Sequence, residues 1–293
     1  MNRRILIAAA LCSSFLAGPV AAQDPIKTVS DGTLTISISS SMPNTGFVDA
    51  SHVDGLDGDI ISYIAEKLGL KLSVMSSDWT GALAAAQTCR SDAVVGPVGW
   101  TTQRAKTGLF TDPTYYTPAL MIQREGSAID SIETMSGKKI GIPQGYLLVP
   151  TLKKIPGVEV QVYPQVSSIY DDLAAGRIDG GIIDTLVQIY VAKTRPELKL
   201  TNLPIKAPTD AQLKDNPGLQ DLLPAVNTYL VCKNEPDLEK AMTKVLNDMR
   251  DDGKMLELLK KWGGDQSYMK AFPFMTTMRV GVDRSQGWTS PSK

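Results

Sequence analysis

The stretch AVVGPVGWTTQRAK, residues 93–106, begins with a short apolar run and continues into a segment that can start a helix. We predict a buried strand over Ala93–Gly96 and a helix that begins near Thr101, whose hydroxyl can cap the first turn. Short apolar strands followed by helices recur along the rest of the chain. This alternation is typical of α/β proteins, in which helices cover mostly parallel sheets.

The other predicted elements follow the same patterns. Apolar residues that alternate with small polar ones predict a strand over Thr33–Ser39, and one apolar face predicts a helix over Asp59–Leu68. We expect Thr80 to cap a helix over Gly81–Gln87. The remaining predicted strands are Lys71–Met75, Ala119–Gln123, Lys139–Ile142, Val158–Val162 and Gly180–Ile183, and the remaining predicted helices are Leu147–Lys154, Ile169–Ala175, Leu186–Ala192, Asp237–Asp251 and Lys254–Trp262.

Two extended segments divide the alternation into two blocks. Thr117–Arg124 leaves the first block and Thr228–Lys233 returns to it, so we expect two lobes joined by two crossover segments. Each lobe is expected to be a mostly parallel sheet flanked by helices. The predicted domains are lobe 1 at residues 23–120 and 229–270, lobe 2 at residues 121–228, and an irregular tail at residues 271–293 on a lobe surface. The Pro-rich polar segment 204–227 is longer than a normal connector, and its role stays open.

Composition excludes several classes of function. The 293 residues contain 30 Lys and Arg against 31 Asp and Glu. This balance, without basic clusters, argues against a nucleic-acid binder. A single histidine argues against histidine-based metal sites and catalytic triads.

The first 22 residues have the pattern of a secretory signal peptide. Arg3 and Arg4 precede a short apolar run, and Val20-Ala21-Ala22 supplies small residues at the cleavage site. The apolar run is too short to span a membrane. Leu11 before Cys12 is too bulky for lipoprotein cleavage, so we expect soluble export to the periplasm or an equivalent oxidising space.

The exported chain keeps two cysteines, Cys89 and Cys232. An even number of cysteines in an oxidising compartment is compatible with a disulfide. Two buried, unpaired thiols are the alternative, and sequence separation does not choose between them.

Two side chains are candidates for a ligand site between the lobes. Ligands of open α/β sheets bind at the carboxyl ends of strands, where helix N-termini present free N–H groups. Arg104 lies in the first turn after Thr101 and can hold a carboxylate with two parallel hydrogen bonds, although a surface ion pair is the alternative. Asp184 follows the strand Gly180–Ile183, where it can bind an ammonium group, cap the next helix, or do both.

Eight short motifs follow one another between Thr33 and Trp262. They are GLDGDI (55–60), DWTGAL (78–83), SDAVV (91–95), TTQRAK (101–106), FTDPTYY (110–116), GKKIG (137–141), AGRIDG (175–180) and LLKKW (258–262). Their ordered set resembles the periplasmic solute-binding proteins of polar amino-acid ABC importers. The resemblance implies a two-lobed periplasmic-binding-protein fold of type II, a hinge and no cofactor. It also implies a small-molecule ligand, an inner-membrane ABC permease as partner, and a monomer.

The resemblance assigns roles to three residues. Arg104 matches the arginine that binds the α-carboxylate of the ligand, and Asp184 matches the acid that holds the α-ammonium. Trp79 matches an aromatic wall of the site, with a place in the lobe core as its alternative.

Other positions depart from the family pattern. Gly99 stands where a hydroxyl residue is common, and Gly145-Tyr146 replaces the start of a Gly-Thr-Thr loop. The usual aromatic before Pro43 is absent, and Phe47 is the candidate replacement. Trp79, Trp100 and Tyr146 then line a wider, more apolar cleft, unless Trp100 and Tyr146 turn into the lobe cores.

These features predict a binding protein that closes around its ligand. The expected ligand is a small zwitterion or organic carboxylate with an apolar, aromatic or alkylammonium part. One alternative is a periplasmic accessory protein of a quinoprotein dehydrogenase, which the stretch Cys89–Asp92 slightly favours. A periplasmic dehydratase with Asp184 as general acid is the other, but no second catalytic group accompanies it and His52 is isolated. We therefore expect a protein that is not an enzyme.

Overall fold

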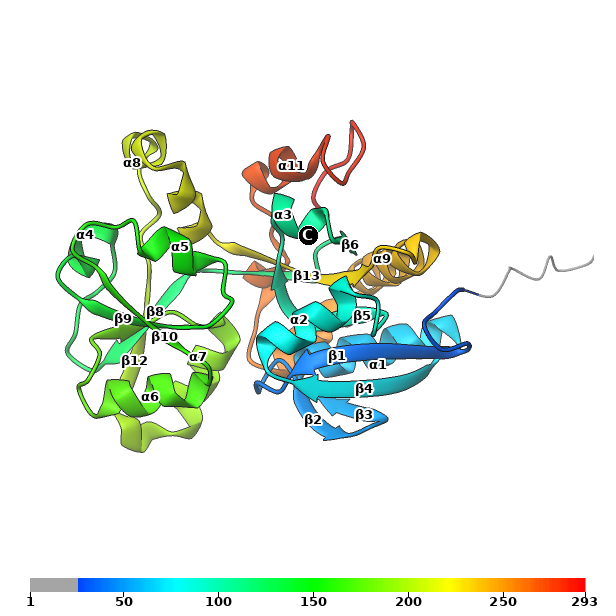
Figure 1. Cartoon of the computed structure of the whole chain (residues 1–293), viewed down its shortest axis with the longest axis horizontal. Coiled ribbons are helices and arrows are strands. Elements are labelled where there is room, and N and C mark those ends of the chain that lie inside the picture. The colour runs from blue at the N-terminus through cyan, green and yellow to red at the C-terminus, as the bar shows by residue number, and fades with distance from the viewer. Residues whose placement is uncertain (1–25, 293) are drawn as a thin grey trace, which may run out of the picture.

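The computed structural model describes residues 26–292, and the predicted signal peptide at residues 1–22 lies outside this range. The described chain forms two lobes that lie side by side, each a sheet flanked by helices (Figure 1). Among residues 26–292, no helix combines the length and the apolar character that a membrane crossing requires.

The sheet of lobe 1 has the strand order β4-β1-β5-β13-β6, with β7 paired to β13. Strands β1, β4 and β5 are parallel, and β13 is antiparallel to its neighbours. The alternating sequence of β1 places Ile36 in the main core, whereas Ser37 donates a hydrogen bond to the Ala82 carbonyl of α2 at 2.7 Å. Small polar residues on this face therefore let α2 pack closely on the sheet. The strands are β1 (Thr33–Ser39), β4 (Lys71–Ser77), β5 (Ala93–Gly99), β6 (Gly108–Phe110), β7 (Tyr115–Thr117) and β13 (Ala225–Cys232), beside a hairpin of β2 (Gly46–Asp49) and β3 (His52–Asp54), and the helices are α1 (Leu56–Leu68), α2 (Trp79–Gln87), α3 (Thr102–Ala105), α9 (Pro236–Asp251) and α10 (Lys254–Lys261).

Lobe 2 holds the second sheet, with the order β10-β9-β11-β8-β12. Strands β9, β10 and β11 are parallel, and β8 is antiparallel to both of its neighbours. The strands are β8 (Leu120–Arg124), β9 (Lys139–Pro143), β10 (Glu159–Tyr163), β11 (Gly180–Gly181) and β12 (Leu200–Pro204), and the helices are α4 (Ile132–Met135), α5 (Leu148–Leu152), α6 (Val166–Ala174), α7 (Thr185–Thr194) and α8 (Asp210–Asp215) with the short 3-10 turns η1 (Pro196–Leu198) and η2 (Pro217–Leu222).

The chain passes between the lobes twice. The first passage is Pro118-Ala119, between β7 and β8. The second ends at Ala225, which already pairs with Thr117 of β7, so the chain enters lobe 1 a few residues before the expected position 229. The segment 204–227 contains α8 and η2, which its sequence pattern does not reveal, and Leu219 and Leu222 bury it in a core of lobe 2.

The C-terminal segment packs on lobe 1. It contains the 3-10 turn η3 (Gln266–Met269) and the helix α11 (Pro273–Arg279), which lies above α3 in Figure 1. Arg279 is 1% exposed and donates hydrogen bonds to the carbonyls of Phe110 and Thr111. Ser290 contacts the Tyr116 hydroxyl at 2.9 Å. The tail is therefore anchored to β6 and β7 by buried polar contacts, beyond the surface strap that the sequence predicts.

Cys89 and Cys232 form a disulfide, with their Cα atoms 5.0 Å apart. The structure thus has the bridge rather than the two free thiols that the sequence left as an alternative. The bridge joins the turn after α2 to the end of β13.

A carboxyl group lies in the core of lobe 1. Asp57, in the first turn of α1, is fully buried and accepts hydrogen bonds from the hydroxyls of Tyr115 and Tyr229 at 2.9 and 2.8 Å. Burial disfavours the charged form and raises the pKa of Asp57 from 3.8 to about 7. Between these values the folded protein holds a proton that the unfolded chain has released. The free energy of unfolding therefore falls as pH rises through this window.

We expect Asp57→Asn to make the free energy of unfolding less dependent on pH between about 4 and 7. The amide keeps the hydrogen-bonding shape but does not titrate, so a contribution of up to about 4 kcal/mol is removed from the pH dependence. Urea unfolding at several pH values measures this difference. Burial also raises the pKa of Glu235 to about 8, so a residual slope of the same sign stays in the variant. If the free energy of unfolding changes with pH equally in both proteins, Asp57 does not contribute to the pH dependence.

Candidate functional site

A cavity of about 570 Å³ lies between the two lobes. Residues that follow the carboxyl ends of β1, β4 and β5 line it from lobe 1, and residues that follow β9, β10 and β11 line it from lobe 2. Its volume is within the usual range for small-molecule sites. The parallel strands of both sheets thus end at one shared cleft, as expected from the sequence.

Arg104 supplies a buried positive charge to this cavity. Thr101 caps α3 by accepting a hydrogen bond from the Arg104 amide at 3.0 Å, which sets the direction of the side chain. The guanidinium donates to the Gly99 carbonyl at 2.9 Å and, across the cleft, to the Gly145 carbonyl at 3.3 Å. Within residues 26–292 no carboxylate lies at ion-pair distance from it, and Arg104 is only 9% exposed. Burial lowers its pKa, but an arginine stays charged in proteins, so the site presents a cation without an anion.

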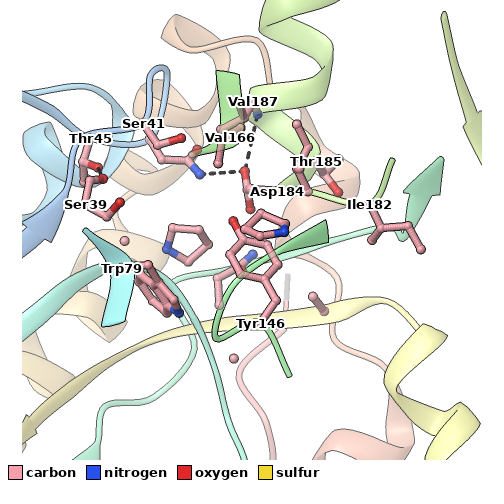
Figure 2. Close-up of a pocket in the computed structure, with 18 of the residues that line it drawn as sticks. Ser39, Ser41, Thr45, Trp79, Tyr146, Val166, Ile182, Asp184, Thr185 and Val187 are labelled. Carbon is pink, nitrogen blue, oxygen red and sulfur yellow. Dashed lines mark hydrogen bonds between the residues drawn. The ribbon is translucent and has the colours of Figure 1, made fainter. Parts of the chain in front are cut away.

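Asp184 supplies the opposite charge from lobe 2. It caps α7, accepting hydrogen bonds on Oδ1 from the amides of Leu186 and Val187 at 3.0 and 3.4 Å. Oδ1 also accepts a 2.6 Å hydrogen bond from Nδ2 of Asn44 in lobe 1. Burial raises the pKa of Asp184, and these hydrogen bonds oppose that shift. The two roles that the sequence left open therefore coincide, because the helix cap also faces the cavity (Figure 2).

Trp79 and Tyr146 form an aromatic wall between the two charges. Their ring centroids lie 6.3 Å apart in an edge-on arrangement, and both line the cavity with Asp184 (Figure 2). Trp79 is the first residue of α2, and Asp78 caps this helix by accepting from the Gly81 amide at 2.7 Å. The prediction of Thr80 as the cap was wrong, because the helix begins two residues earlier than expected.

Four predicted site residues do not line the cavity: Trp100, Phe47, Thr101 and Gly145. Trp100 is 8% exposed and packs against Phe110 in a core of lobe 1. Phe47 is 44% exposed on the β2–β3 hairpin. For Trp100 the structure has the alternative, a place in the lobe core. The Phe47 amide donates to the Ser40 hydroxyl at 3.2 Å, just after β1, but its ring is exposed and does not line the cavity. Ser41 and Met42 line the cavity instead.

Gly99, Gly145 and Thr101 do not offer a free side-chain group to the cavity. Gly99 lines the cavity, and Gly145 contributes the carbonyl that Arg104 contacts. The Thr101 hydroxyl is used by the cap of α3.

The sequence prediction missed several polar residues that line the cavity, among them Asn44, Asp78 and Asp221. Asp221 belongs to η2 and accepts a hydrogen bond from Thr151 at 2.8 Å, while burial raises its pKa. Asn44 follows Pro43 in the loop after β1. A polar residue after the carboxyl end of a strand is a detectable signal for a ligand site. Asp221 had no such signal, because its segment shows no periodicity.

Residues 34–265 match the model of one protein family, the bacterial extracellular solute-binding proteins, family 3. The chain belongs to this family. The resemblance predicted from the eight motifs is thereby confirmed.

Relatives of this solute-binding protein include the L-cystine-binding protein TcyJ of Escherichia coli (strain K12), which is 26% identical over 238 residues, 80% of this chain and 83% of that protein. A solved ancestral arginine-binding protein bound to arginine is 25% identical, with a TM-score of 0.67 over 80% of this chain and 99% of that chain. A solved ancestral amino-acid-binding protein, AncCDT-1, a precursor of cyclohexadienyl dehydratase, is 21% identical, with a TM-score of 0.64 over 79% of this chain and 95% of that chain. These structures confirm the predicted two-lobed α/β fold of type II.

Leu147 of lobe 2 lies against Gly99 of lobe 1 in the structure of this solute-binding protein. A Cβ atom on Gly99 would lie 2.5 Å from Cδ2 of Leu147. This distance is shorter than the van der Waals contact of two carbon atoms, so one of them would have to move. A larger residue at position 99 must therefore displace the Leu147 side chain or hold the two lobes further apart.

We expect Gly99→Val to weaken ligand binding at least tenfold, because the added side chain obstructs closure. The ligand is the amino acid that raises the melting temperature of the unaltered protein most. Isothermal titration calorimetry measures its affinity for both proteins. Leu147→Ala in the Gly99→Val background removes the obstructing methyl groups and should recover most of the loss. Leu147→Ala alone is the control. Full affinity in Gly99→Val would show that this contact does not limit closure.

Proposed function

We propose that this solute-binding protein captures a small amino-acid-like zwitterion or organic carboxylate in the periplasm and delivers it to an ABC permease. The observation that carries the proposal is the pair Arg104 and Asp184. They come from different lobes, carry opposite charges and line one cavity. A zwitterion can satisfy both poles at once.

The mechanism follows from the division of the site between the lobes. In this mechanism the ligand carboxylate binds Arg104 of lobe 1, and the ligand ammonium binds Asp184 of lobe 2, since both residues line the cavity. These contacts form together only when the cleft is shut, so the ligand binds the closed state better than the open one. Such differential affinity is what shifts a hinge equilibrium.

The charges of the cavity support a ligand with an additional cationic part. Asp78, Asp184 and Asp221 line the cavity together with Arg104. The wall of Trp79 and Tyr146 favours apolar surface or a cation over the rings. The names of the relatives, which include cystine- and arginine-binding proteins, support amino acids that carry more than one charged group.

Binding without catalysis is the favoured interpretation. His52, the single histidine, lies on the β2–β3 hairpin and does not line the cavity. The stretch 89–92, which favoured an accessory protein, stabilises lobe 1. Cys89 forms the disulfide, and the Asp92 carboxylate accepts hydrogen bonds from the amides of Val29 and Thr35.

A thermal-shift screen of amino acids, betaines and aromatic acids tests the proposal. A ligand at 100 times its Kd adds about 2.7 kcal/mol to the free energy of unfolding, which raises the melting temperature measurably. Arg104→Ala should then weaken binding by several kcal/mol, because the ligand carboxylate is left desolvated and unpaired. Unchanged affinity in this variant, measured by calorimetry, would remove Arg104 from the site.

The same ligand should be recovered chemically unchanged. Mass spectrometry after prolonged incubation with the protein measures this, with buffer alone as the control. Conversion of the ligand would favour the dehydratase alternative.

A further inference from the structure

Asn44 places an unused hydrogen-bond acceptor beside the negative pole of the cavity. Its side chain is fully buried and lines the cavity. Nδ2 donates to Oδ1 of Asp184 at 2.6 Å, and the amide oxygen Oδ1 of Asn44 has no hydrogen-bond partner within residues 26–292. The chemistry of the partner determines this orientation, because a carboxylate only accepts and the NH₂ group must face it.

The backbone of Asn44 is held by the start of α1. The carbonyls of Pro43 and Asn44 accept hydrogen bonds from the amides of Leu56 and Asp57 at 2.7 and 2.8 Å. Gly55 makes this approach possible: its φ is 98°, and a Cβ atom there would lie 2.4 Å from the Asn44 carbonyl oxygen. The core of lobe 1 therefore sets the direction of the Asn44 side chain before any ligand arrives.

A buried amide oxygen without a donor is unfavourable, and it stays so until a ligand supplies an N–H or O–H group. The nearest charge is the Asp184 carboxylate, since Nδ2 of the same amide binds it. A group that satisfies both must carry positive charge and hydrogen-bond donors together. A protonated primary or secondary amine has both properties.

We propose that Asn44 Oδ1 and Asp184 together bind an ammonium group that carries N–H donors, and that this pair selects against quaternary ammonium ligands. The proposal rests on the proposed function and narrows its ligand class. A trimethylammonium group brings the charge for Asp184 and suits the rings of Trp79 and Tyr146. It has no donor for Asn44, however, so binding it leaves the buried oxygen unpaired.

The same contact makes Asn44 a positioning residue for closure. The Asn44–Asp184 hydrogen bond joins lobe 1 to lobe 2. An ammonium that bridges Oδ1 of Asn44 and the Asp184 carboxylate adds a second connection between the lobes at the same point. Only a cation with N–H donors forms this second connection, so the protein distinguishes between cations as the cleft closes.

The test uses matched pairs of probes in calorimetry: L-arginine, L-lysine, L-phenylalanine and L-tryptophan, each with its Nα-trimethyl derivative. We expect every amino acid that binds to do so at least tenfold more tightly than its trimethyl partner. Asn44→Leu keeps the shape of the side chain without its hydrogen-bonding groups. In this variant both ligands lose the contribution of the Asn44–Asp184 contact to closure, but the amino acid should lose at least tenfold more affinity than the trimethyl derivative, so the preference disappears.

Ser41→Ala is the control, because Ser41 lies in the same loop and lines the cavity without contacting Asp184; it should keep the preference. Thermal melting of each variant verifies folding. Equal affinity for both members of a pair would overturn this assignment alone, as would an equal loss for both in Asn44→Leu. Absence of binding for both members of every pair, together with an empty screen, would overturn the proposed function and this assignment with it.

Discussion

A guanidinium buried between two lobes, with no carboxylate of residues 26–292 at ion-pair distance, is the constraint on which the site depends. Arg104 is placed by the cap of a helix that begins directly after a central strand, and its donors reach carbonyls of both lobes. Carbonyl groups solvate the guanidinium but do not neutralise it. Within the described chain this charge is thus uncompensated, and the proposed function assigns its compensation to an anionic ligand.

The rest of the cleft is divided so that neither lobe completes the site. Lobe 1 holds Arg104, Trp79 and Asn44, and lobe 2 holds Asp184 and Tyr146. Their contacts cross the cleft: Asn44 to Asp184, Arg104 to the Gly145 carbonyl, and ring to ring. Each contact across the cleft needs both lobes in place. The affinity of the site therefore depends on the angle between the lobes. Sequence changes at Gly99 or Gly145 act on both.

The sequence predicts the parts of the site that follow from strand and helix order. Arg104 and Asp184 are found because each follows the carboxyl end of a strand, where the topology determines the position of the next side chain. The sequence left the direction of the Trp100 ring open and wrongly placed Phe47 in the cavity, because the direction of a ring depends on tertiary packing. Asn44 was visible as a polar residue after Pro43, but its position in the site depends on α1, which comes later in the chain and holds its loop.

The disulfide has a topological consequence. Cys89 and Cys232 both belong to lobe 1, yet they are 143 residues apart, and all of lobe 2 with both passages between the lobes lies between them. The covalent bond closes this stretch into a ring. A protease that nicks the chain once anywhere in the ring, including at the hinge, leaves both lobes on one molecule. A single cut in either passage between the lobes thus does not release a lobe for as long as the bridge stays oxidised.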